Sequence, residues 1–207
     1  MKIAVFGATG GTGKQIVEQA LEQGFEVTAF VRDLAKLTIS HEKLTIVTGD
    51  ILKPNTVDGG VAGVDVVISA LGATTPILAA GTANIIAAMK KYGAKRLIIE
   101  SSYTFSGSRK GVERLKAQGV SSEQIASFQP ILDDKTAQEA QTRESGLEWV
   151  IVRPLALTDG PKTGQYRVGE KLDLNLEDHI SRADVADFML KCVKDNKWLG
   201  KTVVISY

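Results

Sequence analysis

Apolar residues along this chain recur with two different periods, and segments of the two kinds alternate. Short apolar or alternating runs rich in β-branched residues predict strands, whereas apolar positions three and four residues apart predict helices that bury one face. The expected strands span residues 3–6, 25–31, 44–48, 64–70, 96–100, 147–152 and 201–206. The expected helices span residues 14–23, 82–92, 133–145 and 181–190. This alternation is typical of an α/β protein.

The order of these segments also predicts how the strands pair. The run 64–70 is almost wholly apolar, as expected for a strand that helices cover on both faces. We predict a doubly wound, mainly parallel sheet in the order 3-2-1-4-5-6 with one added edge strand. Residues 103–130 and 155–180 break the alternation, and we interpret them as substrate-side insertions forming a small lobe within a single domain, 1–207.

The first strand runs directly into glycines at the spacing GxxGxxG, and a helix follows at once. Such a turn aims backbone N–H groups and the positive end of the helix dipole at one point, which suits a phosphate. In this arrangement Gly7 makes the tight turn, Gly10 lets a diphosphate approach, and Gly13 packs the helix on the strand. The candidate diphosphate-binding residues are therefore Gly7, Thr9, Gly10, Gly11, Thr12 and Gly13.

Two other interpretations of these glycines are weaker. A βα turn that binds nothing has the same local sequence, but the order of strand, glycines, helix and second strand favours a dinucleotide site. A Walker-type phosphate loop is excluded because five residues separate Gly7 from Gly13 and because Gln15 stands where that loop needs Ser or Thr.

The tip of the second strand, about 20 residues beyond the glycines, lies beside the adenosine ribose in this architecture. An acidic residue there binds the ribose 2′-hydroxyl, whereas arginine accommodates a 2′-phosphate. Arg32 takes the tip and Lys36 follows one turn later, which favours NADP. Asp33 keeps NAD open as an alternative, and Arg32 as a solvated loop cation is another.

Other candidate residues follow the next strands. Asp50 is placed to accept from the adenine amino group while Ile51 packs on the ring, although an Asx turn explains Asp50 nearly as well. Leu71 and Gly72 end the fourth strand at the carboxyl edge, where open α/β sheets bind ligands. Ser102 follows the fifth strand, where its hydroxyl could orient a nicotinamide amide or an acceptor, or satisfy local backbone.

Composition narrows the function classes. The net charge of +1, from 25 basic and 24 acidic residues, gives no general attraction to nucleic acid or an anionic membrane. A single cysteine, Cys192, suggests a reducing compartment, and neither a signal peptide nor a membrane span is expected. We therefore expect a soluble, cytoplasmic protein. No Cys/His cluster suggests a metal. Surface or capping positions are expected for His41 and His179, and a solvated helix face for the basic residues Arg109, Lys110, Arg114 and Lys116.

Longer motifs resemble one family over nearly the whole chain. They are FGATG with TG at 6–13, VRD at 31–33, GD at 49–50, NIIAAMK at 84–90, RESGL at 143–147, TGQY at 163–166 and FMLKC at 188–192. On these motifs the chain resembles the atypical short-chain dehydrogenase/reductase group of NAD(P)H-binding, NmrA-like proteins. Within it, the chain is most similar to the flavin reductase / biliverdin-IX-beta reductase family.

This resemblance implies a Rossmann fold, NADPH as hydride donor, and a small flat acceptor, with FMN or FAD as a substrate. It implies that Thr9 to Gly13 bind the diphosphate, that Arg32 and Lys36 bind the 2′-phosphate, and that adenine lies near Asp50 and Ile51. The nicotinamide side would lie near Leu71, Gly72, Ser101, Ser102 and Pro154, and the family's active-site serine falls on Ser102.

Two departures from the family affect the chemistry. Ala156 stands where mammalian members have a histidine. The Tyr-x-x-x-Lys pair of ordinary short-chain dehydrogenases is also missing, because the residue four positions after Tyr103 is Gly107 and the residue four positions after Tyr166 is Glu170. Without a positioned acid, we predict an NADPH-dependent reductase of a flavin or quinone with weak pH dependence. A dinucleotide sensor without turnover is the alternative, and a sugar-nucleotide epimerase is a weaker one.

Overall fold

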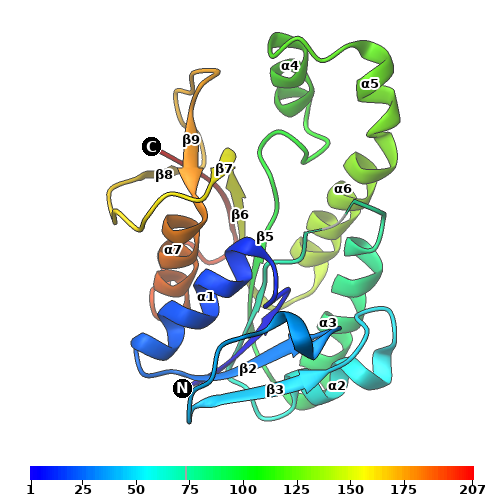
Figure 1. The fold of residues 1–207 in the computed structure, drawn as a ribbon. Helices are drawn as coiled ribbons and strands as arrows, with labels where there is room; N and C mark the ends of the chain where they lie inside the picture. Colours follow the sequence, from blue (N-terminus) through cyan, green and yellow to red (C-terminus); the bar gives the residue numbers. More distant parts are fainter. Residues whose placement is uncertain (73) are drawn as a thin grey trace.

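An eight-stranded sheet runs through the centre of the computed structural model, which describes residues 1–72 and 74–207, and helices lie on both of its faces (Figure 1). The strands are β1 Lys2–Phe6, β2 Glu26–Val31, β3 Leu44–Thr48, β4 Val66–Ser69, β5 Arg96–Glu100, β6 Glu148–Pro154, β7 Ala156–Thr158, β8 Arg167–Gly169, β9 His179–Ser181 and β10 Lys201–Ser206. The helices are α1 Gly11–Glu22, α2 Pro54–Val61, α3 Leu78–Tyr92, α4 Arg109–Ala117, α5 Ser122–Ser127, α6 Gln129–Glu144 and α7 Arg182–Lys194, with a 3₁₀ turn, η1, at Leu34–Lys36.

The strand order is β3-β2-β1-β4-β5-β6-β10-β8, so the predicted order of the first six strands is confirmed. One added strand was predicted beyond the sixth, but the sheet has two, β10 and β8. β10 pairs parallel with β6, and β8 then pairs antiparallel with β10. β8 has only three residues, too few for a hydrophobic period, and β7 and β9 form a separate two-stranded sheet. The segment 155–180 therefore contains strands that its pattern did not predict.

Side chains alternate between the two faces of the sheet and build two cores. One core lies under α1 and α7 and includes Val5, Ile98 and Val152. The other lies under α2, α3 and α6 and includes Phe6 and Ile99, the sequence neighbours of residues on the first face. Figure 1 shows α1 and α7 together on one side and α3 and α6 on the other. Because β1 to β6 run parallel, their carboxyl ends meet at one edge of the sheet.

α2 was not predicted, and α3 and α6 begin four residues before their predicted starts. No helix was predicted at 54–61, where α2 begins with Pro54 and buries Val57 and Val61. α3 starts at Leu78 rather than at residue 82, because the Asp134 carboxylate accepts hydrogen bonds from the N–H groups of Leu78 and Ala79 at 2.7 and 2.9 Å. α6 starts at Gln129 rather than at residue 133, with a proline in its first turn, where proline is tolerated.

The segment 103–130 forms α4 and α5 and rises beyond the carboxyl edge of the sheet (Figure 1). Most of its predicted basic helix face is exposed, but Arg114 is buried. The Arg114 guanidinium donates to the carbonyls of Asn175 and Leu176 at 2.9 and 2.7 Å. The prediction of a solvated side chain is therefore wrong for Arg114, which joins this segment to the loop before β9.

Candidate functional site

The glycines after β1 form a turn in which side chains would clash. Gly7 has φ of +81°, and a Cβ there would lie 2.4 Å from the carbonyl oxygen of Ala70 on the neighbouring strand. A Cβ on Gly13 would lie 2.0 Å from the carbonyl oxygen of Gly7. A Cβ on Gly11 would lie 2.5 Å from Arg182 of α7. Close packing of α1 on the turn after β1 thus requires glycine at position 13, and the approach of this turn to Ala70 requires glycine at position 7.

The amino end of α1 has the properties that an anion site needs. Its N-cap is Gly10, so no side chain accepts the first N–H groups of the helix, and its first turn contains no acidic residue. Orphan N–H groups and the helix dipole therefore point toward the carboxyl edge of the sheet. These features fit the diphosphate of a dinucleotide.

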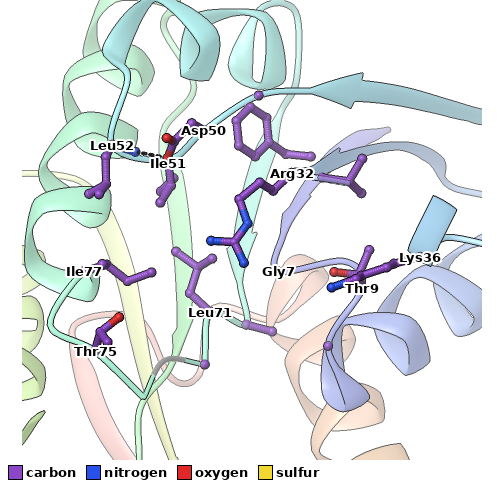
Figure 2. A pocket seen from close by; sticks show the side chains of 16 residues that line it. Gly7, Thr9, Arg32, Lys36, Asp50, Ile51, Leu52, Leu71, Thr75 and Ile77 are labelled. Carbon is purple, nitrogen blue, oxygen red and sulfur yellow. Dashed lines mark hydrogen bonds between the residues drawn. The ribbon is translucent and has the colours of Figure 1, made fainter. Parts of the chain in front are cut away.

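A pocket of about 440 Å³ extends from this turn across the tips of β2 and β3 (Figure 2). In Figure 2 the Arg32 guanidinium points into the pocket. Lys36 also lines it, and within the described residues neither cation forms a salt bridge with a carboxylate. Asp33 is used differently, because its carboxylate accepts from the Ala35 N–H at 3.1 Å and caps η1. One end of the pocket is therefore cationic.

Adenine-side candidates also line this pocket. Ile51 is buried, and Leu52 and Ile77 contribute further apolar surface. The Asp50 carboxylate accepts from the Leu52 N–H at 3.0 Å, which is the Asx turn that the sequence left open (Figure 2). Asp50 is also one of the residues that line the pocket. Apolar walls with one acceptor suit an adenine ring.

A second pocket, of about 510 Å³, lies on the other side of the glycine-rich turn. Gly10, Leu71 and Gly72 line both pockets, so the two form one cleft along the carboxyl edge. Its apolar wall consists of Phe105, Phe128, Ile131 and Leu157. The two aromatic rings come from the 103–130 segment and meet edge to face, with centroids 5.6 Å apart. Leu71, Gly72, Ser101 and Ser102, which the sequence analysis expected on the nicotinamide side, line this pocket, whereas its apolar wall was not predicted.

The three candidates beyond β5 and β6 occupy different places. Ser102 lines the second pocket, and its oxygen accepts from the Phe105 N–H at 3.1 Å. Ser101 also borders it, but its hydroxyl donates to the buried Glu139 carboxylate at 2.6 Å. Pro154 is a buried residue of β6 and is absent from the described lining of both pockets. Of the two serines, Ser102 is therefore the one that forms no hydrogen bond with a buried carboxylate among the described residues.

Glu139 anchors a structural network behind the pocket. Its carboxylate accepts from Arg153 at 2.8 and 2.6 Å and from Arg143 at 2.6 Å. Burial alone would raise the pKa of Glu139, but these hydrogen bonds and charges outweigh it and hold the pKa below its ordinary value. Ser101 is therefore hydrogen-bonded to the carboxylate of an ion-pair network, and this bond positions the end of β5.

Glu100 is a pocket residue that the sequence analysis missed. It is the last residue of β5, is 8% exposed, and lines the second pocket. The Thr12 hydroxyl donates to its carboxylate at 3.0 Å, so this hydroxyl is not directed at a diphosphate as expected. Burial raises the Glu100 pKa to about 7, opposed by this hydrogen bond and by Lys135 and Arg182. The sequence did contain a signal for this residue: Glu100 directly follows Leu97, Ile98 and Ile99 in a strand that is covered on both faces.

Lys135 of α6 was also missed. Its side chain lines the same pocket and is half-buried. Burial lowers the pKa of Lys135, and the nearby carboxylates of Glu100, Glu139 and Asp134 oppose that shift. The pocket therefore combines an apolar wall with two ionisable groups whose burial destabilises their charged forms.

The remaining candidates lie elsewhere. His41 accepts from the Lys43 N–H in a turn, and His179 packs against Tyr207. Tyr166 donates to Asp187 at 2.7 Å, away from the cleft. Within residues 1–72 and 74–207 no cluster of His, Cys, Asp and Glu could hold a metal ion. Over the same residues, none of the helices combines the length and the apolarity needed to cross a bilayer.

Known proteins are similar to this chain in sequence or in fold. An uncharacterized chloroplastic protein of Arabidopsis thaliana is 34% identical over 217 residues, covering 99% of this chain and 76% of that protein. Photosystem II assembly factor Ycf39 of Synechocystis sp. is 28% identical, and the match covers 98% of this chain but 61% of that protein. A short-chain dehydrogenase/reductase of Veillonella parvula, solved in complex with NADP, has a TM-score of 0.82 and 19% identity, covering 100% of this chain and 94% of that one.

The family comparison agrees with the geometry of the cleft. Residues 7–196, from the first glycine of the turn to beyond α7, match the NAD(P)H-binding family. The glycine-rich turn, the uncapped end of α1 and the cationic pocket all lie within that range. The chain therefore belongs to the NAD(P)H-binding family and has its Rossmann-type fold.

Proposed function

We propose that this protein is an NADPH-dependent oxidoreductase that reduces a flat conjugated acceptor, such as FMN, FAD or a quinone. The cleft is the observation that supports this proposal. A pocket with a cationic end opens, beside the glycine-rich turn, into a second pocket with an apolar, aromatic wall. Such a cleft has room for a dinucleotide and, next to its reactive end, for a second ring system.

The preference for NADPH over NADH rests on the first pocket. Arg32 and Lys36 line the region where a 2′-phosphate would lie, and a guanidinium binds phosphate through charge-assisted, often bidentate hydrogen bonds. The competing ribose ligand, Asp33, already caps η1. Together these contacts favour a cofactor with an additional phosphate.

The choice of acceptor rests on the second pocket. Phe105 and Phe128 offer ring faces and edges, and Leu157 extends the apolar wall. We propose that the Ser102 hydroxyl orients the nicotinamide amide or the acceptor. When bound, the dinucleotide supplies the hydride, and the protein supplies orientation and electrostatics. Holding the two rings together replaces a bimolecular encounter by a fixed geometry, which can account for most of the acceleration.

One comparison favours a second function. The relative Ycf39 bears the name of an assembly factor rather than of an enzyme. A dinucleotide sensor would use the first pocket in the same way and would offer the second pocket to a partner or leave it unused. Fold does not distinguish the two functions.

A titration followed by an acceptor panel tests the proposal. NADPH and NADH binding are measured first, and NADPH absorbance is then followed with FMN, FAD, a quinone and a linear tetrapyrrole. We expect tighter binding of NADPH and reduction of at least one conjugated acceptor, with little turnover of simple aldehydes or ketones. Tight NADPH binding with no acceptor reduced would contradict the reductase and favour the sensor.

A further inference from the structure

Glu100 stands where the cofactor turn meets the acceptor pocket. In β5, Leu97 and Ile99 face the core under α3 and α6, and Ile98 faces the opposite core. By alternation Glu100 points to the face of α1 and α7, where the Thr12 hydroxyl donates to it at 3.0 Å. Thr12 is the second residue of α1, so the carboxylate lies beside the helix end that fits a diphosphate.

Positive groups surround this carboxylate in the protein without cofactor. Lys135 of α6 lines the same pocket. Arg182 of α7 lines it too, and its guanidinium pairs with Asp159 at 2.6 Å. The amino end of α1 adds a positive dipole. The further carboxylates near Lys135 are Asp134 and Glu139, which, like Glu100, favour the charged form of Lys135.

We propose that Glu100 is the proton donor of the proposed reductase and that it takes up its proton as the dinucleotide binds. The proposal rests on the function inferred above. A diphosphate at the end of α1 brings negative charge next to the Glu100 carboxylate, and a nearby like charge disfavours ionisation of a carboxyl group. Since Glu100 is buried and already titrates near neutral pH, a modest further shift moves it from mostly ionised to mostly protonated.

The proton transfer balances the hydride transfer. The acceptor gains a hydride at one ring atom, and an oxygen or nitrogen of the same conjugated system becomes more basic. The O–H bond of Glu100 then breaks, its electron pair remains on the carboxylate, and a new O–H or N–H bond forms on the acceptor. Solvent returns a proton to Glu100 when the next dinucleotide binds. Weak pH dependence was expected from the sequence because its motifs contain no such acid.

Isothermal titration calorimetry of NADPH binding measures the proton uptake directly. The binding enthalpy is compared at about pH 7.5 in two buffers with different ionisation enthalpies, and we expect uptake on the order of half a proton. Glu100→Gln keeps an acceptor for Thr12 but has no proton to exchange, so the uptake should disappear. Glu144→Gln, at an exposed position near the end of α6, makes the same change of charge and should retain it. The comparison removes any contribution of the phosphates of NADPH.

The outcomes separate this inference from the proposed function. Uptake that persists in Glu100→Gln, or is absent from the wild-type protein while NADPH binds, would overturn the inference and leave the reductase standing. Failure of NADPH to bind would overturn both.

If an acceptor is reduced, its rate should fall with rising pH in the wild-type protein and stay flat in Glu100→Gln, with a loss of roughly 10²-fold for an acceptor oxygen that must be protonated. A Glu100→Gln variant with the wild-type rate and pH profile would contradict proton donation. Uptake without turnover of any acceptor would support the linkage and overturn the reductase.

Discussion

Arg32 and Asp33 are adjacent in the sequence and have opposite charges, but the fold uses them differently. Arg32 lines the first pocket, whereas Asp33 is turned back onto the Ala35 N–H. The proposed preference for NADPH therefore depends on which of the two side chains is hydrogen-bonded within the local turn and not on composition. A 3₁₀ turn capped by Asp33 leaves Arg32 and Lys36 as the charges available to a ribose phosphate.

Replacing Arg32 by alanine should weaken NADPH binding by roughly 1.5–3 kcal/mol, because charge-assisted hydrogen bonds to the 2′-phosphate are lost. NADH binding should change little. Fluorescence titration of both cofactors measures the two effects. Arg109→Ala, at an exposed position of α4, is the matched control and should bind both normally. Equal affinity of the wild-type protein for NADH and NADPH would refute the assignment.

Glu100 also makes stability depend on pH. Its pKa is raised to about 7 in the folded protein by burial, whereas an unfolded chain releases the proton near pH 4.5. Between these values the folded protein binds more protons than the unfolded chain, so its stability falls as pH rises. Glu100→Gln should therefore gain stability relative to the wild-type protein as pH rises through this window, by up to about 3 kcal/mol. Urea denaturation at several pH values measures this, and a difference independent of pH would contradict the burial of an ionised Glu100.

Helices and strands whose bounds depend on residues close in the sequence were predicted from local patterns. β1 to β6 and the glycine turn follow from the apolar period and the positions of the glycines, and the structure agrees. The first turn of α3 could not be predicted, because its cap is Asp134, more than 50 residues away. Glu100 and Lys135 were missed for the same reason, since they line one pocket only after β5 and α6 come together in the fold.

Removing that distant cap gives a prediction for α3. Asp134→Ala leaves the N–H groups of Leu78 and Ala79 without their carboxylate and should lower the free energy of unfolding by about 1–2 kcal/mol. The neighbouring Asp133 is exposed and bonds only to Gln129 among the described residues. Asp133→Ala should therefore change stability by less than about 0.5 kcal/mol. Equal losses in the two variants would mean that the carboxylate of Asp134 does not cap α3.

Two insertions whose structure the sequence did not define form the apolar wall of the second pocket. The segment with α4 and α5 supplies Phe105 and Phe128, and the segment before α7 supplies Leu157. Buried Arg114 joins them through carbonyls of residues 175 and 176. The parallel sheet thus determines where a dinucleotide fits, and the joined insertions determine what lies beside it. Their contacts are long-range, which explains why the acceptor pocket could not be predicted.

In the proposed reaction, one cleft brings a bound dinucleotide and a conjugated acceptor together for hydride transfer. Rapid mixing of the NADPH-loaded protein with FMN or a quinone tests it, with NADPH oxidation and acceptor reduction followed in the same trace. Both signals should change at one rate, and NADPH deuterated at the transferred position should slow them together. A bound NADPH whose absorbance stays constant with every acceptor would contradict the claim.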